Sequence, residues 1–235
     1  MKFIHLLFSL TFWCFTVFGQ YEPRSQGELV SHTYYTLGYN AEHKQAEWVF
    51  YPLDLAGKEL MAERSNNFRV DKSVPGGSAV PADYQKSGYD RGHLCPAADM
   101  AFNANAMNET FYMSNMSPQL PSFNRGVWKK LEEKVRYWGK REKIYVVTGP
   151  VFKNNKERIG RSKVTVPGYF YKVVYAPVRQ EMIAFILPNE RDVRNLPEYT
   201  VTVDSLELLT GIDFFPQLPD SLQSRLERES YYNRW

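Results

Sequence analysis

The feature that most constrains the fold is a long central segment, residues 64–124, in which apolar residues recur at neither helical nor strand spacing. Prolines and glycines such as Pro75, Gly76, Gly77 and Pro96 interrupt it, and Asn and Ser are frequent. A structureless stretch of this length inside a compact domain is usually functional or wrongly parsed. The segment carries most of the polar residues that could take part in binding or chemistry. We therefore expect it to hold the functional residues.

The sequence on both sides of this segment predicts a scaffold of strands and helices. Strands are expected at 46–53, 143–148, 162–178 and 181–187, with a bend at Pro167-Gly168. In 124–140, Val127, Leu131, Val135 and Trp138 recur at helical spacing. A further helix is expected from a cap at Asp204 or Ser205 to Gly211, and another in 219–229. These elements indicate one α+β domain.

Composition excludes several classes of protein. Of 235 residues, 43% are hydrophobic and 23% are charged, which is enough apolar material for a core. The net charge of +3 is far from a histone-like coat, so contact with nucleic acid would need a local cluster of charge. The 2 cysteines exclude a disulfide-rich scaffold and a multi-cysteine zinc module.

The N-terminus has the pattern of a secretory signal peptide, residues 1–19. Lys2 precedes an apolar run over 3–18, and the small residues Val17 and Gly19 suit cleavage before Gln20. A membrane anchor is the alternative, although the run is shorter than the roughly 20 residues of a spanning helix. Acylation at Cys14 is another, although the apolar run continues beyond it.

We therefore expect export of a mature domain, 20–235, to the periplasm or the medium, without a membrane segment. Loss of one lysine with the signal leaves 28 basic against 26 acidic residues, a net charge of +2. Cys95 is then the one remaining cysteine, which excludes an internal disulfide.

Within the central segment, the tetrapeptide Asp90-Arg91-Gly92-His93 combines residue types suited to phosphoryl chemistry. A neutral imidazole can take a proton from water near neutral pH. A guanidinium can hold two phosphate oxygens and keeps its charge. Gly92 allows a sharp turn or the close approach of another group. Alone, the tetrapeptide favours a structural histidine, which is the commoner role of a lone His in a loop.

A longer pattern resembles the DNA/RNA non-specific endonuclease family. It comprises residues 90–100 (DRGHLCPAADM), 110–119 (TFYMSNMSPQ), 123–132 (FNRGVWKKLE) and 147–152 (VTGPVF). The resemblance extends over about residues 45–215, with the two main blocks in the family's order. Cys95 departs from the pattern, since many members have Ala there.

The resemblance implies a ββα-metal (His-Me finger) nuclease core on a mixed, mainly antiparallel sheet flanked by helices. It places His93 at the general base and Asn124 at the single protein ligand of a divalent metal, usually Mg²⁺, with Mn²⁺ as an alternative. Glu132 matches an acidic residue beside the waters of that metal, and Arg91 matches the arginine of the tetrapeptide. Arg64 matches the catalytic arginine across a small gap. Arg69 is its rival.

The chemistry of these residues agrees with the resemblance. Magnesium keeps several waters, so one protein oxygen is enough to place it. Positions 124 and 132 differ by about 80° around a helix, so both side chains can face one site. Water activated by His93 would attack phosphorus, and family membership implies products that end in 5′-phosphate.

Structural interpretations stay open for several of these residues. Asn124 could cap its helix, and Glu132 could pair with Arg136 at i+4. Asn115 and Gln119 are expected to fasten the loop, and His32 and His43 to be ordinary surface or packing residues. Several basic residues could follow a nucleic-acid backbone or simply be solvated: Arg125, Lys129, Lys130, Lys140 and Arg141.

The sequence therefore predicts an exported, metal-dependent endonuclease that binds DNA and RNA through the phosphate backbone. One alternative is a secreted, non-catalytic protein that binds nucleic acid on a nuclease-like scaffold. Another is a metal-dependent phosphodiesterase with a small or lipid substrate. Oligomeric state does not follow from the sequence.

Overall fold

A computed structural model describes residues 21–24, 26–153, 155, 157–191 and 194–235. The predicted signal peptide and its cleavage site lie outside the described residues, as does Cys14. In the part that is described, no helix is both long enough and apolar enough to span a membrane.

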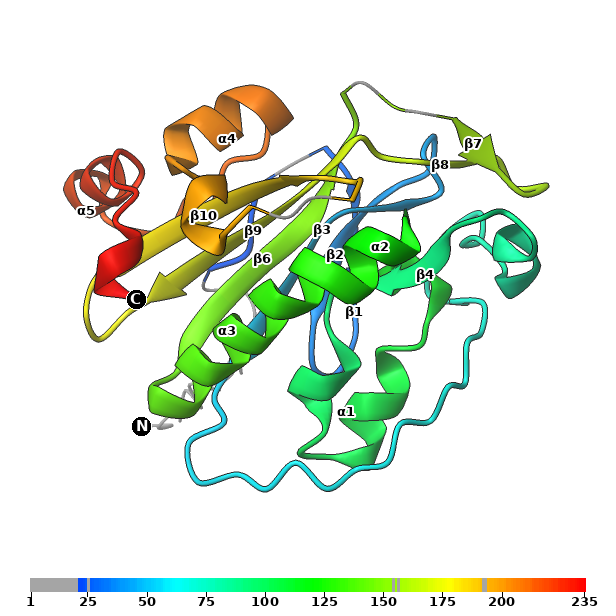
Figure 1. The fold of residues 1–235 in the computed structure, drawn as a ribbon, viewed down its shortest axis with the longest axis horizontal. Helices are drawn as coiled ribbons and strands as arrows, with labels where there is room; N and C mark the ends of the chain where they lie inside the picture. The colour runs from blue at the N-terminus through cyan, green and yellow to red at the C-terminus, as the bar shows by residue number, and fades with distance from the viewer. Residues whose placement is uncertain (1–20, 25, 154, 156, 192–193) are drawn as a thin grey trace, which may run out of the picture.

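The centre of the molecule is a seven-stranded sheet with the strand order β1-β2-β3-β6-β9-β10-β11 (Figure 1). Each neighbouring pair in this order is antiparallel. The strands are β1 (Glu28–Ser31), β2 (Thr36–Asn40), β3 (Gln45–Leu53), β6 (Ile144–Val151), β9 (Tyr169–Ala176), β10 (Glu181–Pro188) and β11 (Thr200–Val201). The predicted class, α+β with a largely antiparallel sheet flanked by helices, is confirmed.

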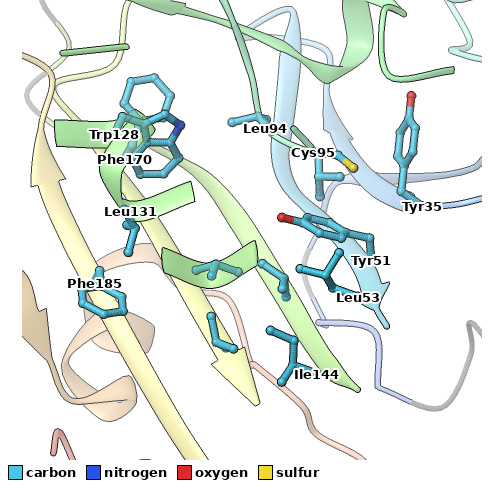
Figure 2. Close-up of a cluster of buried hydrophobic side chains, with 14 of the residues drawn as sticks. Tyr35, Tyr51, Leu53, Leu94, Cys95, Trp128, Leu131, Ile144, Phe170 and Phe185 are labelled. Carbon is cyan, nitrogen blue, oxygen red and sulfur yellow. The ribbon is translucent and has the colours of Figure 1, made fainter. Parts of the chain in front are cut away.

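The two faces of the sheet are covered by different helices, because successive side chains of a strand point to opposite sides. On one face, the helix α3 (Lys129–Arg141) buries Leu131 and Val135 in the same cluster as Val146 of β6 (Figure 2). On the other face, Val147 packs in a second cluster with residues of α4 (Val203–Thr210) and α5 (Asp220–Leu226). Leu94, next to His93, and Phe123, next to Asn124, are buried in the cluster on the α3 side.

The strands predicted from aromatic and β-branched runs are present as β3, β6, β9 and β10. Pro167-Gly168 interrupts the long predicted strand, and separates β8 (Val164–Thr165), which pairs with β7 (Arg158–Ile159), from β9. The helix predicted with a cap at Asp204 or Ser205 has its N-cap two or three residues earlier, at Thr202, whose hydroxyl accepts a hydrogen bond from the Ser205 backbone. It ends at Gly211, which adopts φ +74° as expected for a C-terminal glycine.

The central segment is irregular in sequence but ordered in space. It contains the hairpin of β4 (Asp90–His93) and β5 (Met116–Gln119), together with the short helix α1 (Ala104–Glu109). Each strand has only four residues, which is too few to show an alternation.

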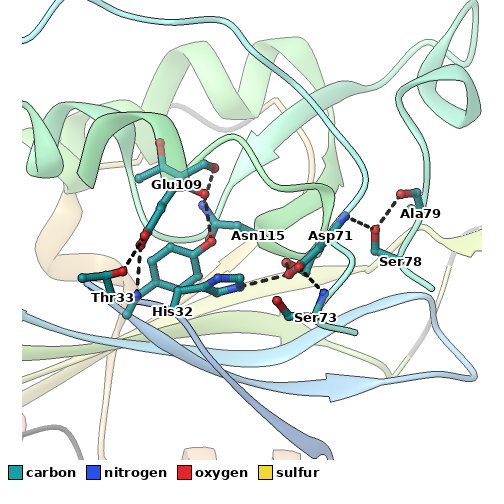
Figure 3. A network of polar contacts seen from close by, with 11 residues as sticks. His32, Thr33, Asp71, Ser73, Ser78, Ala79, Glu109 and Asn115 are labelled. Carbon is teal, nitrogen blue, oxygen red and sulfur yellow. Dashed lines mark hydrogen bonds and ion pairs between the residues drawn. The ribbon is translucent and has the colours of Figure 1, made fainter. Parts of the chain in front are cut away.

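Polar contacts fasten this segment to the connection between β1 and β2 (Figure 3). Asp71 accepts a hydrogen bond from Ser114 at 2.5 Å and contacts His32 Nε2 at 2.9 Å. Thr33 donates to Glu109 from both its backbone and its hydroxyl. His32 therefore serves packing, as expected, and His43 likewise stacks on Phe152 and contacts Thr165.

Candidate active site

His93 is the last residue of β4, paired with Met116 of β5. The preceding residue must be glycine, because a Cβ on Gly92 would lie 2.2 Å from the side chain of Gln119. The hairpin therefore needs the residue that the tetrapeptide supplies, and its tight closure sets the position of the histidine.

The His93 ring is held in a mostly apolar slot. The residue is 8% exposed, and the rings of Phe68 and Phe111 meet it edge-on with centroids at 5.8 and 4.9 Å. Burial, followed by the charges of Arg64 and Arg91, lowers the pKa of His93 to about 3. The ring also bonds the Arg91 backbone, whereas Nε2 is without a partner among the described residues. His93 is thus a neutral base with one available nitrogen at neutral pH.

The helix that carries Asn124 begins earlier than predicted, at α2 (Pro121–Phe123). Asn124–Trp128 then forms a π-helical turn, distorted at Gly126 (φ −106°, ψ −113°), before α3 begins. Such turns occur often at functional sites. Asn124 does not cap the helix, so that interpretation is wrong; Leu120 occupies the N-cap position.

Asp90 fixes the orientation of the Asn124 side chain. The Asn124 Nδ2 donates to Asp90 Oδ2 at 2.9 Å, so its carbonyl oxygen is the atom left for a ligand. Arg125 holds the same carboxylate through two hydrogen bonds of 2.9 and 2.7 Å. The sequence motif contains Asp90 but does not indicate this role. Its partners are 34 and 35 residues away, and no local pattern predicts that contact.

Glu132 lines the same cavity about two helical turns after Asn124. It lies close to the buried charges of Asp99 and Lys172. The suggested Glu132–Arg136 pair is not the main contact of Arg136, whose guanidinium bonds the fully buried Asp99 at 2.7 Å. Burial raises the pKa of Glu132 to about 7, with the charge of Lys172 opposing the rise and that of Asp99 adding to it. Lys172 rises from β9 beneath the helix, with Nζ 4.9 Å from the Trp128 ring centre. Neither Asp99 nor Lys172 had been assigned a role from the sequence.

The structure separates the two candidate arginines. The guanidinium of Arg64 lies over the Phe111 ring at 4.9 Å, and that of Arg91 over the Phe68 ring at 3.9 Å. Both border the His93 cavity. Arg69 instead lies over Tyr112 and donates to the Asn108 carbonyl at 2.9 Å. Arg64 is therefore the arginine that accompanies His93.

All the predicted site residues border one cavity of about 490 Å³: Arg64, Arg91, His93, Asn124 and Glu132. Of the basic residues considered for nucleic-acid binding, Arg125 and Lys129 also reach it, and Lys129 lies 3.7 Å from Glu133. Asn115 bonds the backbone of Cys95 and Thr110, so it fastens the loop as expected.

The donor set in this cavity fits a hard divalent cation. The free oxygen of Asn124 and the carboxylate of Glu132 are the kind of ligands that Mg²⁺ and similar ions prefer. The hydrogen bond from Asn124 to Asp90 holds the amide in the orientation that presents its oxygen, which is the usual role of a residue behind a metal ligand.

Comparison with known proteins decides the family. The sequence model described as DNA/RNA non-specific endonuclease matches residues 19–221. The chain belongs to the DNA/RNA non-specific endonuclease family.

Named relatives agree with this assignment. A protein of Nostoc sp. named "Nuclease" is 36% identical over 82% of this chain and 75% of its own length. Endonuclease G of Bos taurus is 34% identical over 81% of this chain and 70% of its own. The mitochondrial nuclease of Saccharomyces cerevisiae is 36% identical, and the match covers 66% of its length, slightly less than two thirds.

A solved structure of the complex of EndoG with EndoGI superimposes with a TM-score of 0.75. The identity is 32%, over 83% of this chain and 88% of the other. The resemblance noted in the sequence and the ββα-metal nuclease fold that it implied are both confirmed. The chain is thus a nuclease, and the family uses a divalent metal.

Proposed function

We propose that this protein is an exported endonuclease that hydrolyses phosphodiester bonds of DNA and RNA without sequence specificity. The reaction depends on a divalent metal, and Mg²⁺ is the first candidate. The observation that carries the proposal is the Nε2 of His93, which has no partner among the described residues and faces a cavity that also holds two arginines and the oriented Asn124.

In this proposal each residue has one task. His93 Nε2 takes the proton from the water that attacks phosphorus, because a neutral imidazole is the available base. Arg64 and Arg91 hold the non-bridging oxygens and stabilise the charge that develops on them. Glu132 orders water in the lower part of the cavity. A divalent cation held by Asn124 would neutralise the phosphate and stabilise the leaving oxygen.

Export is the second part of the proposal and rests on the sequence of residues 1–19. We place the mature domain, 20–235, in the periplasm or the medium. N-terminal sequencing of the secreted protein should give a terminus near Gln20. A terminus at Met1, or an acyl group on Cys14, contradicts this part.

The general base is tested by His93→Ala, with His43→Ala as a matched removal of a histidine outside the cavity. Cleavage of plasmid DNA by His93→Ala should fall by about 10²–10⁴-fold, while DNA binding and the thermal midpoint stay close to wild type. His43→Ala should retain its rate. A His93→Ala protein with wild-type turnover would remove His93 from the mechanism.

The metal is tested by Asn124→Ala and by chelation. Excess chelator should silence the wild type, and Asn124→Ala should need a higher Mg²⁺ concentration and turn over more slowly. Full activity in chelator contradicts metal dependence. Persistent DNA binding without any cleavage, at every metal tried, would favour the non-catalytic binding protein instead.

Breadth of substrate follows from contacts made to phosphate rather than to base edges. Double-stranded DNA, single-stranded DNA and RNA should be cleaved at rates within about two decades of one another, and activity should fall as salt rises from about 50 to 200 mM. Discrete bands or dependence on one sugar contradict this expectation. Activity confined to small phosphodiesters would favour a phosphodiesterase with a small or lipid substrate.

The assignment of Arg64 is tested against Arg69. Arg64→Ala should lower the cleavage rate with little effect on the thermal midpoint, because its side chain is exposed at the cavity. Arg69→Ala should change stability more than rate, because Arg69 bonds the backbone of Asn67 and Asn108. The reverse pattern exchanges the two roles.

A further inference from the structure

Three carboxylates gather on the sheet face opposite the active site, where α4 meets the end of α5. Asp204 and Glu207 stand three positions apart on α4, and Glu227 follows α5 directly. One ligand oxygen from each lies within 4.8 Å of the other two. Residues three apart on a helix share one face, so α4 presents two carboxylates toward Glu227.

Backbone hydrogen bonds hold this arrangement together. The Asp204 backbone N–H donates to the Glu227 carbonyl at 3.1 Å, which ties α4 to the residue after α5. Glu207 Oε1 accepts from the Phe214 backbone N–H at 2.8 Å. The three side chains are therefore brought together by the fold, although like charges repel.

One oxygen of the cluster is buried and unsatisfied. Glu227 is 7% exposed, and its Oε1 has no hydrogen-bond partner within the described part of the chain. A buried carboxylate oxygen is costly unless a donor or a cation satisfies it. This orphan oxygen is an observation independent of the clustering, and it calls for a positive ligand.

In the described part of the chain, the cation that pairs with the cluster does not meet this need. Arg228 Nε is 3.9 Å from Asp204 Oδ2, and the Arg228 side chain is 76% exposed. Gln223 donates to Asp213, a further acidic neighbour, at 3.3 Å, and its side chain also bonds the Glu227 carboxyl group, where Oε1 stays unsatisfied within the described residues. Burial together with the charges of Glu227, Asp213 and Asp204 raises the pKa of Glu207 to about 7, against a hydrogen bond from Phe214. Negative charge therefore exceeds positive charge here.

We propose that Asp204, Glu207 and Glu227 form a second cation site, suited to Ca²⁺, which fastens the C-terminal segment to α4 and is separate from the active site. The donors are all oxygen, and Ca²⁺ binds carboxylate oxygens at about 2.3–2.6 Å in flexible geometries. Two oxygens on one such ion can be up to about 5 Å apart, which matches the observed spacing. Waters complete the coordination, since Asp204 is exposed.

Calorimetric titration with Ca²⁺ tests the site in the full-length mature protein. An Asn124→Ala protein, whose active-site ligand is removed, should bind one Ca²⁺ with a Kd of about 10⁻⁵–10⁻³ M. Saturating Ca²⁺ should raise its Tm by about 5 °C or more. In the same background, the double substitution Asp204→Asn with Glu207→Gln should weaken Ca²⁺ binding at least about tenfold. Loss of a residue that merely supports a metal ligand already has an effect of this size. Glu190→Gln, an exposed carboxylate elsewhere, should change nothing.

Circular dichroism shows whether the double variant folds; if it does not, Glu207→Gln alone gives the same comparison. The proposal is overturned if Asn124→Ala binds no Ca²⁺ up to about 10 mM, ten times the weakest expected Kd. Equal binding by the double variant and its parent overturns it as well.

Discussion

Carboxylates crowd together at two places on opposite faces of the same sheet, and the two places are neutralised differently. Around the active site, the half-buried Asp90 pairs with Arg125, and the fully buried Asp99 pairs with Arg136. Between α4 and α5, three carboxylates share one distant and exposed arginine, Arg228.

Burial is the largest cause of the pKa shifts at both places, and it favours the neutral form of each group. Burial, with the charges of Arg64 and Arg91, lowers the pKa of His93 to about 3. Burial, with neighbouring acidic groups, raises the pKa of Glu207 to about 7. The active-site side has a surplus of positive charge, which suits a polyanionic substrate. The α4–α5 side has a surplus of negative charge, which suits a cation from solvent.

The largest expected effect comes from removing a built-in partner on the active-site side. Arg136→Met removes the ion-pair partner of the fully buried Asp99 and leaves it the Tyr51 hydroxyl and the charge of Lys172, and should lower the free energy of unfolding by about 3–5 kcal/mol. Arg228→Met, the matched change on the other face, should cost less than about 0.5 kcal/mol, because its ion pair is exposed. Urea unfolding of both variants measures the difference. Equal losses would contradict the contrast.

A smaller effect is expected where a partner orients a ligand. Asp90→Ala releases the Asn124 amide, and should lower kcat/KM by about 10–100-fold at limiting Mg²⁺. Asp90→Asn can still accept the hydrogen bond from Asn124 and should retain more activity. If both variants lose the same activity, the ion pair between Asp90 and Arg125 is what matters, and the orientation of Asn124 is not.

The low pKa of His93 predicts a specific acid sensitivity. Between pH 6.5 and about 3 the unfolded chain binds a proton at this position that the folded protein does not. Stability from this group is therefore complete above pH 6.5 and falls on acidification, by up to about 1.4 kcal/mol per pH unit. Unfolding free energies of the wild type and His93→Gln, compared at pH 6 and pH 5, should diverge by about 1 kcal/mol. Parallel losses would show that the ring is not held neutral.

The smallest expected effect is a change in stability on the α4–α5 side whose sign depends on Ca²⁺. In chelator, Glu207→Gln removes one of three crowded charges but keeps the oxygen that accepts from Phe214, and should stabilise the protein by about 0.5 kcal/mol. With saturating Ca²⁺ the same variant should be less stable than the wild type. Thermal unfolding in the two buffers checks the reversal. Destabilisation in both would mean that Glu207 is a purely structural acceptor.

Much of the scaffold was predictable because its signals are local. Aromatic and β-branched runs predicted β3, β6, β9 and β10, and the helical spacing of Val127, Leu131, Val135 and Trp138 predicted α3. The motif also gave His93, Asn124 and Glu132 their place in one site, and these residues do border one cavity.

Only the tertiary structure decided the contacts between distant parts of the chain. It joined Asn124 to Asp90, placed Lys172 of β9 beneath Glu132, and separated Arg64 from Arg69. It also brought Glu227 to α4. Periodicity records which side of its own element a residue faces. Which other element packs against that side depends on the topology of the whole sheet.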